Sequence, residues 1–360
     1  MWPRTDLLDL LGIEHPIIQA PMAGSATPAL AAAVSNAGGL GSLGCGAMSL
    51  ADLKANAEAL RAGTNRPFNL NFFAHAAPRD DPETDARTAR RLAPFYDELG
   101  LQVPAAAEAP FAPFSAATLA VLLEVKPAVV SFHFGLPAPD AVAALKAAGA
   151  RVLSSATTVA EARSLAAAGV DAVIAQGWEA GGHRGTFETS FEDFGVGTLA
   201  LVPQVADAVE VPVIAAGGIA DGRGVAAAFA LGASGVQMGT AFLSCPEARI
   251  SDAHRVALGQ ASDQDTRLSR AFSGRPARAA NNRYIAAMAE RREALPEFPA
   301  MYAFSEPLRA WSEANERPDF QFLLYGQAAA LNRVLSAADL VARLAEEARA
   351  IFAELRAEAR

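Results

Sequence analysis

Short runs of β-branched and aliphatic residues recur along the chain, and each is followed by a glycine-containing turn and an alanine-rich stretch. Eight such runs occur, at residues 15–21, 40–46, 67–73, 128–134, 151–156, 172–177, 211–217 and 235–240. The segment 158–169 between two of them, "TVAEARSLAAAG", places Val159, Ala162 and Leu165 on one face and ends at Gly169. This spacing is typical of an amphipathic helix. The pattern therefore predicts a strand–helix unit repeated eight times.

Strands that are separated by helices pair in parallel, because a parallel neighbour requires a crossover connection. Eight such units close into an α/β fold, the (β/α)8 or TIM barrel, and an open doubly wound sheet is the alternative. The chain has 360 residues, whereas a barrel of this kind takes roughly 250 residues before insertions. We therefore expect a barrel with additions.

Two segments supply the additional length. Residues 74–125 form an insertion after the third run, rich in proline and alanine, with a predicted helix at 85–99. We expect residues 1–250 to form the barrel with this insertion. Residues 251–360 are expected to form a mainly helical region that covers the substrate, with a terminal amphipathic helix packed back on the barrel.

The composition excludes several classes of partner. The chain is 52% hydrophobic and 19% charged, with a formal net charge of -9. Nucleic-acid binding is not expected, because phosphate contacts need clustered lysine and arginine. No run approaches the roughly 18 strongly apolar residues of a membrane span, and the first residues lack a signal design, so we expect a cytoplasmic protein without a membrane partner. A monomer and a homodimer both stay open.

Residues that could carry chemistry on their own are scarce at the carboxyl ends of the predicted strands, where barrels place their active sites. The three lysines, Lys54, Lys126 and Lys146, do not follow a strand, so a Schiff-base nucleophile is not expected. No loop shows metal-ligand spacing, and Cys45 and Cys245 are predicted to be small buried residues. The chemistry is therefore expected to come from an organic cofactor.

Glycine-rich turns follow the seventh and eighth runs. "AAGGIADGRG" contains Gly217 and Gly218, and "QMGTAF" contains Gly239 and Thr240. Such turns leave backbone amides, together with a helix N-terminus, free to surround a phosphate. The phosphate could belong to a flavin mononucleotide or to a sugar phosphate.

Neutral amides occur on two other strands. Asn69 and Asn71 alternate with apolar residues, so both point to the same side of the third strand, and Gln176 ends the sixth. Such amides suit the hydrogen-bonding edge of a flavin ring, with the backbone of residues 20–22 as a rim against it.

One histidine stands out among five. His183 lies in the glycine-rich loop "QGWEAGGHRG" after the sixth strand, where an imidazole can accept a proton from carbon or hold an anion. His133, near the end of the fourth strand, is predicted either to line the pocket or to be buried. His15 and His254 are predicted to be structural, and His75 stays undecided.

Several segments resemble one family in order and spacing. They read "HPIIQAPMAG", "SNAGGLGSLG", "PFNLNFF", "GWEAGGHRG", "VPVIAAGGIADGRG" and "QMGTAF", followed by "SGRPARAANNRYI" and "LLYGQAA". Together they resemble the nitronate monooxygenases, formerly called 2-nitropropane dioxygenases. The resemblance covers nearly the whole chain. It implies a barrel that holds FMN noncovalently under a smaller helical domain.

The resemblance also implies an activity, the oxidation of alkyl nitronates such as propionate 3-nitronate by O2 to a carbonyl compound and nitrite. Carried over by position, the family's catalytic histidine falls on His183. It would act as a base toward neutral nitroalkanes and as an anion-orienting group toward nitronates. His133, Tyr302 and Tyr325 are expected on the substrate side, and Tyr325 in "LLYGQ" stands where we expect a tryptophan in a "WAGQ"-like segment. The implied FMN contacts are Ala20, Pro21, Met22, Asn71 with Asn69 as second choice, Gln176, Gly181, Gly182, Gly217, Gly218, Gln237, Met238, Gly239 and Thr240.

Three alternatives stay open at this point. An FMN-dependent enoyl reductase of the same fold would use NAD(P)H and a similar histidine. A flavin-free phosphosugar isomerase or lyase would use the same phosphate loops. A noncatalytic flavin-binding protein would release no nitrite.

Overall fold

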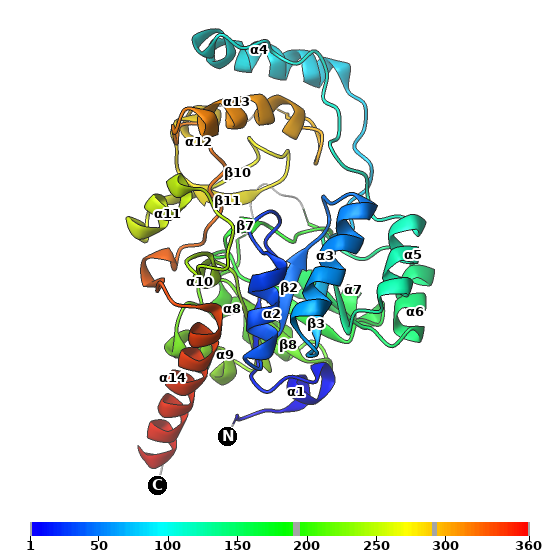
Figure 1. The fold of residues 1–360 in the computed structure, drawn as a ribbon, viewed down its shortest axis with the longest axis vertical. Coiled ribbons are helices and arrows are strands. Elements are labelled where there is room, and N and C mark those ends of the chain that lie inside the picture. Colours follow the sequence, from blue (N-terminus) through cyan, green and yellow to red (C-terminus); the bar gives the residue numbers. More distant parts are fainter. Residues whose placement is uncertain (1, 190–194, 290–293, 359–360) are drawn as a thin grey trace.

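Eight parallel strands alternate with helices around a closed barrel in the computed structural model, which describes residues 2–189, 195–289 and 294–358 (Figure 1). The hydrogen-bonded order is β1-β9-β8-β6-β5-β4-β3-β2, and a parallel bridge between Ile18 and Leu40 joins the two ends. The predicted TIM barrel is therefore confirmed, and an open sheet is excluded. The strands are β1 (Ile17–Gln19), β2 (Gly41–Gly44), β3 (Phe68–Phe73), β4 (Val129–His133), β5 (Arg151–Ala156), β6 (Ala172–Gln176), β8 (Val213–Ala216) and β9 (Gly235–Met238).

Local capping fixes where many of the barrel helices begin. Thr27, Ser49, Ser115 and Thr158 each accept a hydrogen bond from a backbone N–H three residues later, which satisfies an otherwise unpaired amide of the first turn. The helices that follow the strands are α2 (Pro28–Asn36), α3 (Leu50–Gly63), α5 (Ala116–Val125), α6 (Pro139–Ala147), α7 (Val159–Ala167), α8 (Thr198–Ala206), α9 (Gly222–Ala230) and α10 (Thr240–Leu243).

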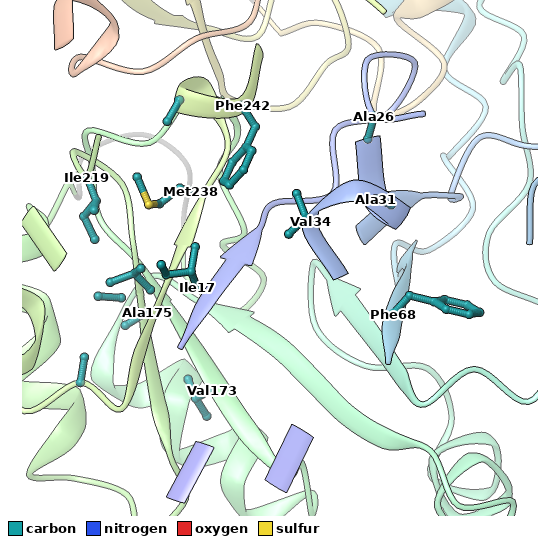
Figure 2. Packing of buried hydrophobic residues seen from close by; sticks show 14 of the residues in the cluster. Ile17, Ala26, Ala31, Val34, Phe68, Val173, Ala175, Ile219, Met238 and Phe242 are labelled. Carbon is teal, nitrogen blue, oxygen red and sulfur yellow. The ribbon is translucent and has the colours of Figure 1, made fainter. Parts of the chain in front are cut away.

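Alternation along the strands builds two apolar layers. Ile17 and Val173 face the surrounding helices, and Figure 2 shows them together with Val34 of α2. Their neighbours Ile18 and Ile174 face the barrel interior, as strand geometry requires. The helix α1 (Asp6–Leu11) packs Leu7 and Leu11 against this interior layer and closes the amino end.

A second core lies over the carboxyl end of the barrel. We use "cap" for α4 (Pro82–Leu99), β10 (Thr266–Ser269), β11 (Ala277–Ala280), α12 (Arg283–Ala289) and α13 (Tyr302–Ala314). Leu92 and Tyr96 of α4 pack with Phe272, Tyr284 and Phe304, so the helix predicted at 85–99 exists and joins the cap (Figure 1). The strands β10 and β11 were not predicted within a region expected to be mainly helical.

The terminal helix α14 (Ala337–Glu358) packs against α9 and α2 of the barrel. Leu340, Val341 and Leu344 form the buried stripe that the amphipathic pattern predicts. The connection between the cap and α14 includes the short helix η1 (Ala329–Leu331), and α11 (Asp252–Gly259) follows α10. Among the described helices, none is both long and apolar enough to cross a membrane.

Candidate active site

The loop after β6 is held in place by the side chain of Gln176. Its Nε2 donates to the carbonyl oxygen of His183 over 2.9 Å, and its Oε1 accepts from the backbone N–H of Gly185 over 2.7 Å. Residues Gly182 and His183 form the short strand β7 (Gly182–His183), which pairs antiparallel with β11 of the cap. Gly182 has a left-handed φ of +75°, which glycine adopts without the steric cost that a side chain would bring. Barrel and cap thus hold His183 from opposite sides.

The imidazole of His183 is surrounded by rings and anchored at one nitrogen. Its Nε2 lies 2.8 Å from Ser273 Oγ, and the rings of Phe73, Phe298 and Phe322 have their centroids 5.5 to 6.4 Å from its own. Burial lowers the pKa of His183 to about 3, and the neighbouring His133 and Arg275 lower it further. The side chain is therefore uncharged near neutral pH.

His133 supports this arrangement from β4. Its Nε2 donates to the carbonyl oxygen of His183 over 3.0 Å. Burial lowers the pKa of His133 to about 4, so it is also uncharged. Of the two alternatives that the sequence left open, lining the pocket and being buried, the structure shows the first, since the half-buried His133 lines the cavity.

A cavity of about 1010 Å³ opens at the carboxyl end of the barrel, beneath the cap. Such a volume is at the upper end of small-molecule and cofactor sites, which typically measure roughly 300 to 1,000 Å³. The predicted site residues that line it are Ala20, Pro21, Met22, Asn71, His133, Gln176, Gly181, Gly182, His183, Gly217, Gly218, Gln237, Met238, Gly239, Thr240 and Tyr302.

Two residues of the predicted site lie away from this cavity. Asn69 is fully buried one layer deeper in the barrel, where its Nδ2 donates to Ser42 Oγ and Ser131 Oγ. Asn71 is therefore the strand β3 amide that faces the cavity. Tyr325 packs in a separate apolar cluster, with its ring 6.1 Å from that of His254, while its neighbours Leu324 and Gly326 line the cavity instead.

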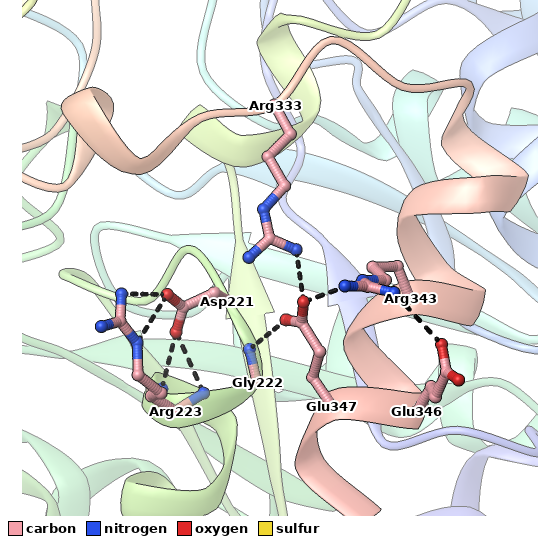
Figure 3. A network of polar contacts seen from close by, with 8 residues as sticks. Asp221, Gly222, Arg223, Arg333, Arg343, Glu346 and Glu347 are labelled. Carbon is pink, nitrogen blue, oxygen red and sulfur yellow. Dashed lines mark hydrogen bonds and ion pairs between the residues drawn. The ribbon is translucent and has the colours of Figure 1, made fainter. Parts of the chain in front are cut away.

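The turn after β8 departs from the expected phosphate site in one respect. The first amides of α9 are already occupied by carboxylates, because Asp221 Oδ1 accepts from Arg223 and Gly224, and Glu347 Oε2 accepts from Gly222 (Figure 3). Although a helix N-terminus alone attracts anions, the carboxylates of Asp221 and Glu347 would repel a phosphate here. The expectation that the α9 N-terminus binds phosphate is therefore wrong. The left-handed turn at Gly217 and Gly218 and the loop after β9 still line the cavity.

Two glycines allow the His183 loop to contact the segment that follows the cap helix α13. A Cβ at Gly181 would lie 2.5 Å from the backbone nitrogen of Gly326, and one at Gly326 would lie 2.6 Å from the carbonyl oxygen of Glu179. Real Cβ atoms do not approach so closely, so both positions require glycine. Gly326 N–H also donates to Thr240 Oγ1 over 2.9 Å, which ties this crossing to the loop after β9.

Sequence reasoning predicted Tyr302 of the cap but missed Ser273 and Arg275, which the cap also supplies. Ser273 contacts His183, and the Arg275 guanidinium lies 3.9 Å from the centroid of the Phe134 ring and donates to the Thr186 carbonyl. Burial lowers the pKa of Arg275 to about 10, so it stays charged near neutral pH. Both residues lie in the segment "SGRPARAANN", whose likeness to a family motif was the only available signal.

Two residues that line the cavity, Gln237 and His254, each have a buried side-chain atom without a hydrogen-bond partner among the described residues. Gln237 lines the cavity from β9, and its Oε1 is buried without a hydrogen bond from any described residue. An amide oxygen in this state is costly unless a ligand donates to it. No group of three or more His, Cys, Asp or Glu side chains could hold a metal ion within the described part of the chain.

The fold and the site define a TIM-barrel enzyme whose histidine and glycine-rich loops face a cavity under a cap. A family model described as nitronate monooxygenase matches residues 4–347. The chain is 48% identical to a nitronate monooxygenase of Paraburkholderia phytofirmans over 97% of this chain and 96% of the relative. It is 47% identical to a nitronate monooxygenase of Pseudomonas aeruginosa over 94% and 98%, respectively. The chain belongs to the nitronate monooxygenase family.

Solved structures show the same architecture. A nitroalkane oxidase from Streptomyces ansochromogenes superposes with a TM-score of 0.89 at 40% identity, covering 97% of this chain and 99% of that one. FabK from Thermotoga maritima superposes with a TM-score of 0.75 at 32% identity, covering 99% and 100%. The likeness extends over barrel and cap together, because both comparisons cover nearly the entire chain.

Proposed function

We propose that the protein binds FMN in this cavity and oxidises alkyl nitronates, such as propionate 3-nitronate, with O2 to a carbonyl compound and nitrite. The overall reaction balances when two nitronate anions and one O2 give two carbonyl compounds and two nitrite ions. The observation that carries the proposal is the convergence of His183, Gln237 and the glycine-rich loops on a single cavity in a member of this family.

The residues present fit a flavin mononucleotide. The unpaired Gln237 Oε1 requires a donor such as a ring N–H, and Asn71 adds a second neutral amide at the same cavity. The backbone of residues 20–22 gives a rim with little side-chain bulk, and the loops after β8 and β9 would hold the phosphate through backbone amides. When bound, FMN would supply the capacity to accept electrons from the substrate and pass them to O2.

His183 would act on the substrate itself. As an uncharged imidazole it can accept a proton from the carbon of a neutral nitroalkane. A nitronate has already lost that proton, so it needs no base. The rings of Phe73, Phe298 and Phe322 surround His183 and would give short alkyl groups of the substrate an apolar surrounding. Tyr302 of the cap lines the cavity and would face the substrate.

Replacement of His183 tests this assignment. We expect His183→Asn to lower kcat/KM for neutral nitroalkane by about 100-fold or more, since a positioned base contributes roughly 10²- to 10⁴-fold. For the preformed nitronate, we expect a loss below about tenfold. Nitrite release without NAD(P)H measures both, and His15→Asn at the amino end of the barrel is the matched control. Equal retention of both activities would refute the role of His183.

The alternative is an FMN-dependent enoyl reductase that uses NAD(P)H. Its support is the likeness to FabK, at lower identity and lower TM-score than the nitroalkane oxidase. Turnover of a nitronate without any NAD(P)H separates the two functions.

A further inference from the structure

The hydrogen bonds of Ser273 determine which ring nitrogen of His183 carries a hydrogen and which can accept a proton from the substrate. Ser273 Oγ has three polar neighbours: His183 Nε2 at 2.8 Å, the Arg275 carbonyl oxygen at 3.1 Å and the Arg275 backbone nitrogen at 3.3 Å. Ser273 is only 1% exposed. Its hydrogen bonds are therefore made to these protein groups.

A hydroxyl group has one proton to donate and two lone pairs that accept. The Arg275 carbonyl can only accept, so it takes the hydroxyl proton, and the Arg275 N–H donates to one lone pair. The remaining lone pair faces His183 Nε2, which must then carry a hydrogen. If Ser273 instead donated to Nε2, two oxygens would face each other at 3.1 Å without a proton between them. The first arrangement satisfies every contact, and the second does not.

The other ring nitrogen of His183 is open to the cavity. No described residue hydrogen-bonds Nδ1, and this atom is not among the buried polar atoms that lack a partner. His183 is half-buried and lines the cavity. Once Nε2 carries the hydrogen of the neutral ring, Nδ1 presents a lone pair to this space.

We infer that Ser273 is a positioning residue that holds His183 in the Nε2–H tautomer, so that Nδ1 faces the cavity as a proton acceptor. The inference rests on the proposed function. It adds neutral carbon acids, the nitroalkanes, to the nitronates as substrates of the same site. The C–H proton moves to Nδ1, the C–H electron pair forms the C=N bond, and the negative charge goes to the nitro oxygens. An acceptor at Nδ1 gives no hydrogen bond to a nitronate that arrives already ionised. The base role proposed for His183 is thus supported, and the anion-orienting role is not.

The charged and titratable surroundings agree with this geometry. His133 from β4 and Arg275 from the segment before β11 face His183, and together with burial they keep its ring neutral. Negative charge that develops on the substrate favours protonation of the ring, because an opposite charge within about 4–6 Å raises the pKa of an imidazole. The histidine therefore gains basicity as the proton leaves carbon.

The tautomer can be measured directly by NMR on holoprotein labelled with 15N at histidine. We expect wild-type His183 to show a protonated Nε2 and an unprotonated Nδ1 near neutral pH. Ser273→Ala should shift the Nε2 signal and mix the two tautomers, whereas Ser273→Thr, which keeps the hydroxyl, should restore the wild-type pattern. Ser305→Ala is the matched control, because it removes another buried hydroxyl that donates to the neighbouring Phe272 carbonyl without touching His183. A wild-type spectrum with protonated Nδ1, or an unchanged spectrum in Ser273→Ala, would overturn the inference.

Kinetics on the same variants supply the second readout. We expect Ser273→Ala to lower kcat for neutral nitroalkane by about 10- to 100-fold and to change kcat for nitronate by less than about threefold. Ser273→Thr should recover most of the lost rate, and Ser305→Ala should retain it. Equal losses on both substrates would contradict a positioning role. A protein with the expected tautomer that releases no nitrite would contradict the proposed function and leave the tautomer assignment standing.

Discussion

Burial lowers the pKa of every histidine in the chain, because a charged imidazole loses its hydration in the protein interior. His133 and His183 are used at the site, where a neutral ring is what the chemistry needs. His75 differs, since neither of its ring nitrogens has a hydrogen-bond partner among the described residues. Its ring lies 4.9 Å from Phe298 and 5.9 Å from Phe111, centroid to centroid, in an aromatic surrounding that the sequence left undecided.

His75 should therefore make the protein sensitive to acid. Its pKa is about 4 in the folded state against 6.5 in the unfolded state, so the unfolded chain binds the proton first as pH falls. The stability from burying the neutral ring is complete above pH 6.5 and is lost between pH 6.5 and 4. We expect the drop in unfolding free energy between pH 7.5 and 4.5 to be about 2 kcal/mol smaller in His75→Phe than in wild type.

Urea denaturation at the two pH values measures this difference. His15→Phe is the control, because His15 is half-buried and its pKa is lowered less. If wild type and His75→Phe lose stability in parallel, burial of His75 is not the cause.

At the scale of elements, one carboxylate connects the terminal helix to the barrel. Glu347 of α14 accepts from the first amide of α9 and from Arg333 and Arg343 (Figure 3). These partners hold the pKa of Glu347 below its ordinary value, although burial opposes them. The adjacent Glu346 makes a single exposed ion pair with Arg343 at 3.6 Å. Two neighbouring glutamates on one helix thus differ sharply in their contacts.

Substitution of these two glutamates should separate their contributions. We expect Glu347→Ala to lower the free energy of unfolding by about 2 kcal/mol, because it removes the acceptor that a helix amide, Arg333 and Arg343 share and leaves Arg343 only its exposed pair with Glu346. Glu346→Ala should cost less than about 0.5 kcal/mol, as is usual for an exposed pair. Chemical denaturation near neutral pH compares the two. Similar losses in both variants would show that the contact between α14 and α9 does not depend on Glu347.

The eight barrel strands, the barrel helices and the terminal helix could be predicted because each has its own local pattern of apolar residues. Asn71 and Gln176 could likewise be placed at the cavity, since Asn71 lies in the second half of β3 and Gln176 is the last residue of β6, toward the carboxyl end of the barrel. Asn69 lies one layer deeper, where it bonds Ser42 and Ser131 instead of facing the cavity. The depth of the cavity in the barrel depends on the closed fold, so the sequence of β3 alone could not predict this difference. Tyr325 is turned away by the course of the chain between the cap and α14, which no local pattern encodes.

At the scale of the whole molecule, the site is completed by segments far apart in the sequence. Ser273 meets His183 across 90 residues, and α4 from the insertion packs with α13 from the C-terminal region. The pairing of β7 with β11 joins barrel and cap at the histidine itself. Such contacts arise from tertiary packing, so the sequence could indicate His183 but not the residues that orient it.

The central claim is that this cavity holds FMN and that a nitronate, without NAD(P)H, is the electron donor. Anaerobic mixing of the purified holoprotein with propionate 3-nitronate, and separately with NADPH, tests it most directly. We predict rapid loss of the oxidised-flavin absorbance with the nitronate and none with NADPH on the same timescale, followed by nitrite release when O2 is admitted. Rapid bleaching by NADPH alone, or a colourless protein that cannot be reconstituted with FMN, would contradict the account.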